Sequence, residues 1–217
     1  AVTVSDTSAI DYETATTCTI TVRATSADGS TSDTTFTVTL TDVDEFDVGS
    51  ATDTDSDANT LAEDVANGAS AEITASASDA DGTTNTVTYA INSQSCSGAF
   101  AIGESSGAVT VADTSAIDYD AGSTCTITVR ATSADGSTSD TTFTVTLTDV
   151  NDQTPTYSST DTTPSVAEGT TNVETVAITD TDTGDSNTCT LAGQDSSLFT
   201  CTVTATEYAL AFTSAPD

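Results

Sequence analysis

The chain has no lysine, histidine, tryptophan or methionine, and arginine occurs only twice among its 217 residues. Against these two cations stand 34 acidic side chains, which give a formal net charge of −32. A chain with this charge repels phosphate backbones and anionic lipid surfaces, so nucleic acid is not expected as a partner and anionic membranes are poor partners. Because histidine, lysine and a glycine-rich phosphate loop are all missing, the sequence also indicates that the protein is not an enzyme.

No apolar run is long enough to span a bilayer, and no leader peptide is present. We therefore expect the leader of an exported protein to have been removed or to lie outside this sequence. The five cysteines include no C-x-x-C pair, and the absence of histidine argues against a zinc site. Their number indicates disulfides, and hence an oxidising extracellular or cell-surface location.

What the chain does contain is a long internal repeat. Residues 1–43 recur as residues 108–150 with only five substitutions. A period of this length is a whole domain, so we expect a tandem array of domains that each have their own core. The predicted domains are the C-terminal half of one repeat (1–44), one complete repeat (45–151) and the N-terminal half of another (152–217).

Two interpretations of the half-domains at the two ends stay open. In one, the chain is a window of a longer array. In the other, the unfinished C-terminal half-domain of one molecule is completed by the N-terminal half-domain of the next. The second interpretation predicts a head-to-tail homopolymer, because a heterologous contact that does not close propagates along a line.

The repeats consist of strands with a strict period of two. In the run TCTITVRATS, Cys125, Ile127, Val129 and Ala131 alternate with polar residues. The run TTFTVTLTDV alternates in the same way, and the turn SADGS lies between the two runs. This pattern predicts a hairpin with one core face and one solvent face. Short strands over a period of 107 residues predict an all-β fold of tandem Greek-key, Ig-like sandwiches.

Three acidic signatures recur at matching places in the repeats, and each offers oxygen ligands for a hard cation. The first is a glutamate before an early strand, at Glu63 and Glu168. The second is an acidic pair after a short strand, AIDYE with Asp11 and Glu13 or AIDYD with Asp118 and Asp120, and Asp217 aligns with the first member of that pair. The third combines the junctions TDVDEF and TDVNDQTP with the later segments SDADG and TDTDTG.

Together these motifs resemble those of cadherin repeats, namely E, D-x-E, D-x-N-D-x-x-P and D-x-D in that order. The resemblance extends over essentially the whole chain and implies Ca²⁺ bound between successive β-sandwich domains. At the later junction it implies ligation by the side chains of Glu63, Asp118, Asp120, Asn151, Asp152, Asp180 and Asp182, with the backbone carbonyls of Val150 and Gln153. At the earlier junction it implies Asp11, Glu13, Asp44, Glu45, Asp79 and Asp81, while Glu168 and Asp217 hold signature positions of the third repeat.

The sequence departs from the family pattern at two places. The junction DVDEF lacks the proline and replaces both asparagine positions of the family linker, and Ser26 and Ser133 stand where the family has an aspartate. In favour of cation sites, carboxylates from distant parts of the sequence would converge at the junctions. Two carboxylates about 4 Å apart repel by about 1 kcal/mol in water and about 4 kcal/mol at an effective dielectric of about 20. The run Asp53–Asn59 resembles a calcium loop only superficially, since Ala58 replaces its glycine, and it is predicted to be a polar surface loop.

The cysteines suggest two disulfides. Cys125 faces the core and Cys96 lies on an earlier strand of the same repeat, so these two form the natural pair. Cys189 and Cys201 are close enough in the third repeat to pair across neighbouring strands. Cys18 is left over, which implies a partner in an upstream domain or in another molecule.

The leading interpretation is a segment of an extracellular, calcium-stabilised cadherin-like filament or surface stalk. Its partners would be adjacent repeats or copies of itself, and its exposed threonines offer attachment points for O-linked glycans. The alternative is a calcium-dependent adhesin module that binds glycan or another cell surface. An aromatic-bearing loop would favour the alternative, and the sequence offers only Tyr89 and Tyr157 for that role.

Overall fold

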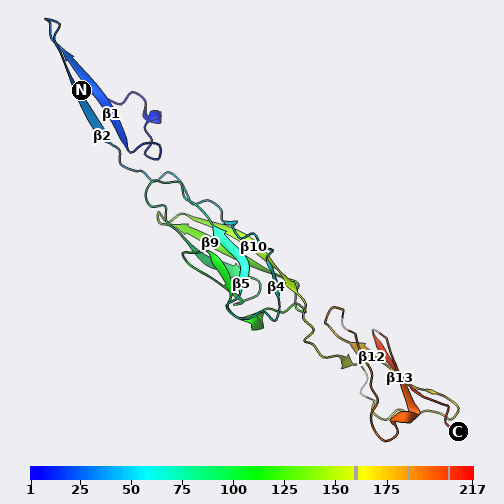
Figure 1. Ribbon diagram of the computed structural model, residues 1–217. Coiled ribbons are helices and arrows are strands. Elements are labelled where there is room, and N and C mark those ends of the chain that lie inside the picture. The colour runs from blue at the N-terminus through cyan, green and yellow to red at the C-terminus, as the bar shows by residue number, and fades with distance from the viewer. Residues whose placement is uncertain (159–160, 185, 205) are drawn as a thin grey trace. The chain divides into compact units, whose positions relative to one another are not determined.

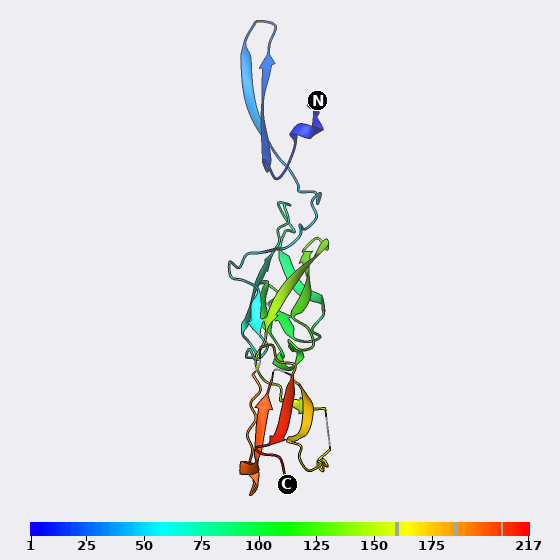
Figure 2. The same cartoon turned by 90° about the vertical axis from the view of Figure 1, so that its right-hand side faces the viewer.

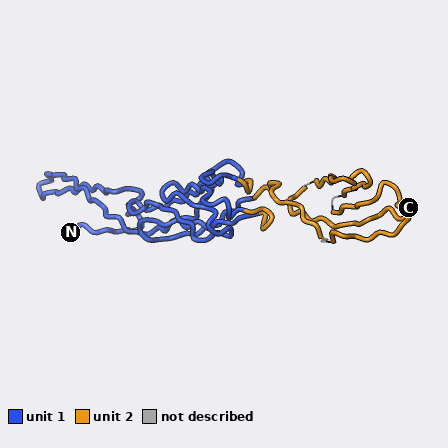
Figure 3. Tube along the Cα trace, turned by 90° about the horizontal axis from the view of Figure 1, so that it is seen from below, with its two compact units in different colours: residues 1–61, 65–117, 124–146 blue, residues 62–64, 118–123, 147–217 orange. Residues whose placement is uncertain are grey.

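The computed structural model describes residues 1–158, 161–184, 186–204 and 206–217. These described residues form strands and three short 3-10 helices (Figure 1). They divide into two compact units (Figure 3), of which unit 1 contains residues 1–61, 65–117 and 124–146 and unit 2 contains residues 62–64, 118–123 and 147–217. The predicted all-β fold class is confirmed. Among the described residues there is no long apolar helix of the kind that crosses a bilayer.

Unit 1 begins with the 3-10 turn η1 (Thr7–Ala9) and the antiparallel hairpin of β1 (Thr17–Thr25) and β2 (Thr31–Thr39). The turn between the strands closes through Gly29, whose φ of 85° lies in the left-handed region that glycine tolerates. On one face, Arg23 forms an ion pair with Asp33, with 2.7 Å between the guanidinium and carboxylate. In both views the ribbon of described residues shows no further strand beside this hairpin (Figure 2).

The central sandwich consists of two four-stranded sheets, with the strand orders β4-β10-β9-β6 and β3-β5-β8-β7. The bounds of these strands are β3 Thr52–Asp53, β4 Thr60–Ala62, β5 Ser70–Ser76, β6 Val87–Gln94, β7 Phe100–Ile102, β8 Ala108–Val111, β9 Thr124–Ser133 and β10 Thr138–Thr148, with the 3-10 turn η2 (Thr114–Ala116) between β8 and β9. The neighbours β9–β10 and β7–β8 are consecutive antiparallel strands, whereas β6–β9, β3–β5 and β5–β8 pair antiparallel with other strands between them in the chain. The two sheets are the two layers that the period-two pattern predicts.

The core of the sandwich lies on the predicted faces of the strands. Ile127 and Val129 on β9 are completely buried, as is Ile73 on β5 to within 1%. Burying one such side chain contributes about 1.5–3 kcal/mol, so this alternating set accounts for much of the driving force. Within the second sheet, the backbone before β8 approaches β5 closely at Gly107 (φ 68°), where an added Cβ would lie 1.9 Å from the Ala75 carbonyl oxygen. Only glycine fits that position.

Unit 2 contains one further four-stranded sheet, with the order β11-β12-β14-β13. Its strands are β11 Thr156–Tyr157, β12 Asn172–Thr179, β13 Phe199–Val203 and β14 Glu207–Phe212, and the 3-10 turn η3 (Ser196–Leu198) precedes β13. Phe199 and Phe212 pair across β13 and β14 and stack with their ring centroids 4.7 Å apart. In order and pairing this sheet repeats β3-β5-β8-β7 of the central sandwich.

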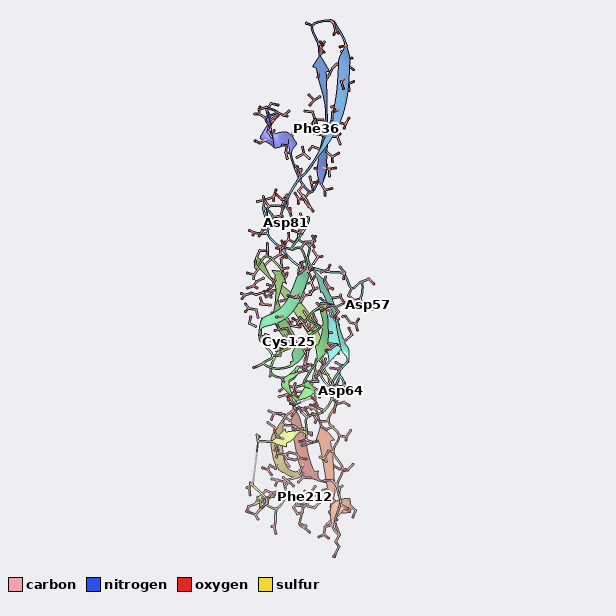
Figure 4. All side chains as sticks on the ribbon, turned by 90° about the vertical axis from the view of Figure 1, so that its left-hand side faces the viewer. Phe36, Asp57, Asp64, Asp81, Cys125 and Phe212 are labelled. Atoms are coloured by element: carbon pink, nitrogen blue, oxygen red, sulfur yellow. A yellow bond between two sulfur atoms is a disulfide. The ribbon has the colours of Figure 1, made fainter. Side chains whose placement is uncertain are left out.

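The structure contains both predicted disulfides, Cys96–Cys125 and Cys189–Cys201. Cys96 lies in the bend after β6 and not on a strand as predicted. Figure 4 labels Cys125, which is completely buried on β9. Cys189 differs from the prediction in one respect, because it lies in residues 186–192, which form no strand, so its disulfide does not join neighbouring strands. Cys18 on β1 is a free and exposed thiol.

Candidate metal centres

An acidic cluster in unit 1 brings together residues from four separate loops. Glu13, Asp42 and Asp81 place one carboxylate oxygen each within 4.8 Å of one another, and Asp44, Asp81 and Asp135 do the same. Glu13 precedes β1, Asp42 and Asp44 follow β2, Asp81 follows β5, and Asp135 lies in the turn between β9 and β10. Asp81, which is only 1% exposed, belongs to both sets (Figure 4). The cluster is therefore assembled by the fold rather than by one acidic stretch.

A second cluster in unit 2 repeats this arrangement. Asp120, Asp149 and Asp182 place one carboxylate oxygen each within 4.8 Å of one another. Asp120 and Asp149 are the repeat counterparts of Glu13 and Asp42, and Asp182 follows β12 as Asp81 follows β5. Asp182 is again buried, with 7% of its surface exposed. Two separate units thus build the same constellation.

Matching hydrogen bonds orient the central aspartate of each cluster. The Glu45 N–H donates to Asp81 Oδ1 over 3.2 Å, and the Gln153 N–H donates to Asp182 Oδ2 over 3.0 Å. The Asp81 N–H donates to Asp79 Oδ1 over 3.2 Å, and the Asp182 N–H donates to Asp180 Oδ1 over 3.1 Å.

A second pair of matching bonds holds the aspartate that follows the last strand of each repeat. The Thr83 N–H donates to Asp42 and the Thr183 N–H donates to Asp149. Backbone donors therefore hold one oxygen of each carboxylate in place.

The other oxygens of these carboxylates are buried without a hydrogen-bond donor among the described residues. They are Glu13 Oε2, Asp42 Oδ1, Asp79 Oδ2, Asp81 Oδ2, Asp149 Oδ1, Asp180 Oδ2 and Asp182 Oδ1. A buried charged oxygen without a partner costs several kcal/mol, and in proteins such groups are paired or bind metal. Clustered carboxylate oxygens without any nitrogen or sulfur donor suit a hard divalent cation.

The electrostatics of the unit 1 cluster reflect this crowding. The pKa of Asp44 is raised to about 6, chiefly by desolvation. A hydrogen bond with Asp81 and the negative charges of Asp135, Asp81 and Asp79 add to this shift. The pKa of Glu45 is raised by desolvation and by neighbouring carboxylates.

The pKa values of two other carboxyl groups are shifted in opposite directions. Desolvation and the charges of Asp182, Asp149 and Glu63 raise the pKa of Asp120, although a hydrogen bond from Thr181 opposes the shift. In contrast, the pKa of Asp79 is lowered, chiefly by a hydrogen bond from Ser133. Without a cation, the negative charges of the clusters therefore destabilise the folded state.

The sequence of residues 58–148 matches the family model of the cadherin domain. This part of the chain is a cadherin-like domain. No curated protein sequence matches the chain. Solved cadherin ectodomains nevertheless share its fold at low sequence identity.

Extracellular cadherin domains 1–4 of protocadherin gamma B7 are 20% identical, cover 96% of this chain and 51% of their own, and have a TM-score of 0.72. Mouse cadherin-23 EC22–24 is 22% identical over 95% of this chain and 67% of its own, with a TM-score of 0.75. The cis-dimer structure of protocadherin gamma B7 EC3–6 is 20% identical over 96% of this chain and 53% of its own, with a TM-score of 0.61. The chain spans about half the length of the first of these structures.

Several residues predicted from the cadherin resemblance lie beside the clusters and make other contacts. Both oxygens of Glu63 accept backbone bonds, from Val150 over 2.7 Å and from Tyr119 over 2.6 Å. Asp118 accepts from the Ala121 N–H, and Asp11 accepts from the backbone of Glu13 and Thr14. These side chains shape the loops that carry the clusters.

The remaining predicted residues fall into two groups. At the later junction, the Asp152 side chain accepts from the Gln153 side-chain amide, and Asn151 lies between Val150 and Asp152 in the linker. In the third repeat, Glu168 and Asp217 line one pocket together with Phe212 and Pro216. Their proximity parallels that of Glu63 and the 118–120 turn, although no acidic cluster forms around them among the described residues.

Three members of the clusters are absent from the predicted sets, namely Asp42, Asp149 and Asp135. Asp149 is the first aspartate of the motif D-x-N-D, and Asp42 is its counterpart in TDVDEF. The motif could therefore have identified both residues. Asp135 belongs to the turn SADGS, where an aspartate is ordinary, and only the fold reveals its approach to Asp44 and Asp81. Two residues beyond Ser133, Asp135 supplies a carboxylate where the cadherin pattern is broken.

One more group, Asp55, Asp57 and Glu72, also approaches within 4.8 Å. Its side chains are half-buried or exposed, and the Asp55 and Asp57 N–H groups donate back to Asp53 and Asp55 within the same loop. These features describe the polar surface loop that the sequence predicts for Asp53–Asn59.

The raised pKa of Asp44 predicts a pH effect in the metal-free chain. The pKa of Asp44 in the folded state, about 6, lies above the ordinary 3.8, so folding favours the neutral carboxyl. This contribution to the free energy of unfolding is complete below about pH 4 and is lost as the pH rises through about 6 and the carboxyl ionises. We expect the urea midpoint of unit 1 in EGTA to fall over that window and the Asp44→Asn variant to lack this slope. An unchanged slope in the variant would assign the effect to other groups.

Proposed function

We propose that this chain is a structural segment of an extracellular cadherin-like filament or surface stalk whose domain junctions are stiffened by Ca²⁺. It works by reach and rigidity rather than by chemistry on a substrate. The observation that carries this proposal is the recurrence, in two units, of the same buried carboxylate oxygens without donors. The domain boundaries at residues 44 and 151 belong to the same proposal, because each cluster contains residues from both sides of one of these boundaries.

The residues present fit Ca²⁺, which takes six to eight oxygen ligands and tolerates irregular geometry. At the earlier junction Glu13, Asp42, Asp44, Asp79, Asp81 and Asp135 would hold the ion. At the later junction Asp120, Asp149, Asp180 and Asp182 would hold it, supported by Glu63, Asp118, Asn151 and Asp152. The ion supplies positive charge that neutralises these carboxylates and ties together loops of consecutive domains.

The structural consequence concerns the linkers 40–48 and 147–155. Without a cation, repulsion among the carboxylates favours separation of the loops that carry them. With a cation, the same oxygens become ligands of a common centre and the linker loses conformational freedom. A filament built from such junctions would therefore be stiff in calcium and slack without it.

The test uses the 217-residue chain stripped of metal. We expect calorimetric titration to show calcium binding at more than one site, and scattering or electron microscopy to show straight particles in millimolar calcium that bend after EGTA. Magnesium at the same concentration serves as the control, because it demands a smaller and stricter octahedral site. Absence of calcium binding, or particles equally straight after chelation, would refute the stiffening mechanism.

A further inference from the structure

The acidic cluster of unit 1 consists of two sets of carboxylates that share one member. In one set, Asp81 places an oxygen within 4.8 Å of oxygens of Glu13 and Asp42. In the other set, Asp81 places an oxygen within 4.8 Å of oxygens of Asp44 and Asp135. Of these five residues, only Asp81 belongs to both sets. The carboxylates therefore converge on two centres rather than on one.

The side chain of Asp81, labelled in Figure 4, can serve both centres. It is only 1% exposed, and its Oδ1 atom accepts from the Glu45 N–H over 3.2 Å. Its Oδ2 atom is buried and has no donor among the described residues. An ionised carboxylate has two oxygens with about four lone pairs, so it can bridge two cations. A buried charged oxygen without a donor, surrounded by other carboxylates, points to a bound cation.

The linker that carries Asp44 is held against the central sandwich by contacts that involve no acidic side chain. The Val48 N–H donates to Ser137 Oγ over 2.9 Å, and Ser137 lies in the turn between β9 and β10. The Val48 side chain is buried, and the Gly49 N–H donates to the Ser78 carbonyl over 2.9 Å. These contacts bring the linker to the β9–β10 turn without the help of a cation.

The Asp135 side chain is fixed within the same turn. Its Oδ1 atom accepts from the Ser137 N–H over 2.6 Å. The turn itself is closed by the Gly136 N–H, which donates to the Ser133 carbonyl over 3.0 Å, and by the Ser133 N–H, which donates to the Ser137 carbonyl over 3.0 Å. A well-ordered turn of the central sandwich therefore presents a half-buried carboxylate to the linker.

The surroundings of Ser133 explain why the carboxylate stands at position 135 and not at position 133, where the cadherin pattern has an aspartate. Ser133 ends β9 and is buried, with 4% of its surface exposed. Its hydroxyl donates to the Thr84 carbonyl over 3.0 Å. An ionised aspartate has no proton to donate, so at this position it would set a negative oxygen against that carbonyl. Position 133 thus supplies a donor, and position 135 supplies the negative charge.

We propose that the unit 1 cluster binds two Ca²⁺ ions, and that the second is held by Asp44, Asp81 and Asp135, with Asp135 as a ligand that the cadherin pattern does not assign. The first ion is held by Glu13, Asp42 and Asp81. Three carboxylates with no nitrogen or sulfur donor suit Ca²⁺, whose remaining ligands are backbone carbonyls and water. The second ion ties the linker to the β9–β10 turn. This inference rests on the calcium binding in the proposed function and divides its ligands at the earlier junction between two ions.

The first test titrates calcium into the metal-stripped 217-residue chain and its Asp135→Asn variant. Asparagine keeps a carbonyl that accepts from the Ser137 N–H, so the turn stays intact. We expect calorimetry to show that one calcium site is weakened by at least about tenfold while the other sites are unchanged. Asp28→Asn is the matched control, because residues 17–43 and 124–150 are identical and Asp28 belongs to no acidic cluster of the described residues. An Asp135→Asn variant that binds calcium as Asp28→Asn does would overturn the proposal.

The second test asks whether the two sets hold two ions or one. Glu13→Gln removes a charge from the first set only, and its remaining oxygen can still accept from the Gly82 N–H, a bond of 3.0 Å. Native mass spectrometry counts the calcium ions bound to each variant, and circular dichroism checks that each is folded. The double variant with Asp135→Asn should lose two ions, whereas Asp44→Asn combined with Asp135→Asn should lose one. If Glu13→Gln and Asp135→Asn together lose only one ion, the cluster has a single centre and the proposal is wrong.

Electron microscopy of the same proteins in calcium and in EGTA separates this inference from the proposed function. If Asp135→Asn loses its ion but wild-type particles are equally straight in both media, the second ion stands and the stiffening mechanism fails. If wild-type particles straighten in calcium but Asp135→Asn titrates like Asp28→Asn, the proposed function stands and the second ion is refuted. A wild-type chain that binds no calcium overturns both.

Discussion

Replacing Asp182 by asparagine is expected to change thermal stability in opposite directions with and without calcium. In EGTA the variant should melt higher than the wild type, because one buried negative charge beside Asp120 and Asp149 is gone. In millimolar calcium it should melt lower, and the calcium affinity of this junction should fall by at least about tenfold. Asparagine keeps the shape of the side chain, so packing changes little.

The two expected shifts in melting temperature have opposite signs because the two oxygens of this carboxylate lie in different environments. One oxygen of Asp182 accepts from the Gln153 N–H, which an asparagine carbonyl still satisfies, while the other is buried without a donor. Two carboxylates about 4–5 Å apart repel by about 1 kcal/mol in water and more in a shielded site. Relief of that repulsion dominates in the apo chain, whereas loss of a charged ligand dominates once calcium is present.

Scanning calorimetry in both media measures the crossing, and Glu104→Gln on the exposed surface is the control for a charge change of the same size. Asp81→Asn should reproduce the effect at the earlier junction, because Asp81 is also buried with one unpaired oxygen. If Asp182→Asn lowers the melting temperature equally in both media, the carboxylate has a purely structural role. If it raises the temperature in both, calcium does not bind there.

The strand faces were predictable because a period of two leaves little choice. Once Cys125, Ile127 and Val129 are assigned to one face, burial requires that face to point inward, and all three are completely inaccessible. The identical run in β1 shows the limit of this reasoning. The pattern predicts which face is apolar, but the exposure of Ile20 depends on whether another sheet covers it, which neighbouring residues cannot specify.

The acidic clusters were predictable in part for a related reason. Motif order placed Glu13, Asp81, Asp120 and Asp182 near the junctions because each follows or precedes a strand end. Asp135 was not predicted, since its distance from Asp44 depends on how the β9–β10 turn and the linker meet in space.

Removing the central disulfide with the pair Cys96→Ala and Cys125→Ala is expected to lower the free energy of unfolding of the central sandwich substantially. The two cysteines are 29 residues apart in sequence. In the chain-entropy account, opening a loop of this size costs about 3.5 kcal/mol, before any loss of packing at the buried Cys125 side chain. Because a domain of this size is stable by only about 5–15 kcal/mol, the loss is a large share of the total.

The chain supplies its own control for this prediction. Cys18 and Cys125 lie in the identical run TCTITVRATS, yet Cys18 is exposed and free. Cys18→Ala at low protein concentration should therefore leave the unfolding free energy within about 0.5 kcal/mol, as for other exposed sites. Urea unfolding followed by circular dichroism measures both variants. Wild-type protein in a reducing agent should converge on the double variant, and if it keeps its full stability the disulfide does not constrain this fold.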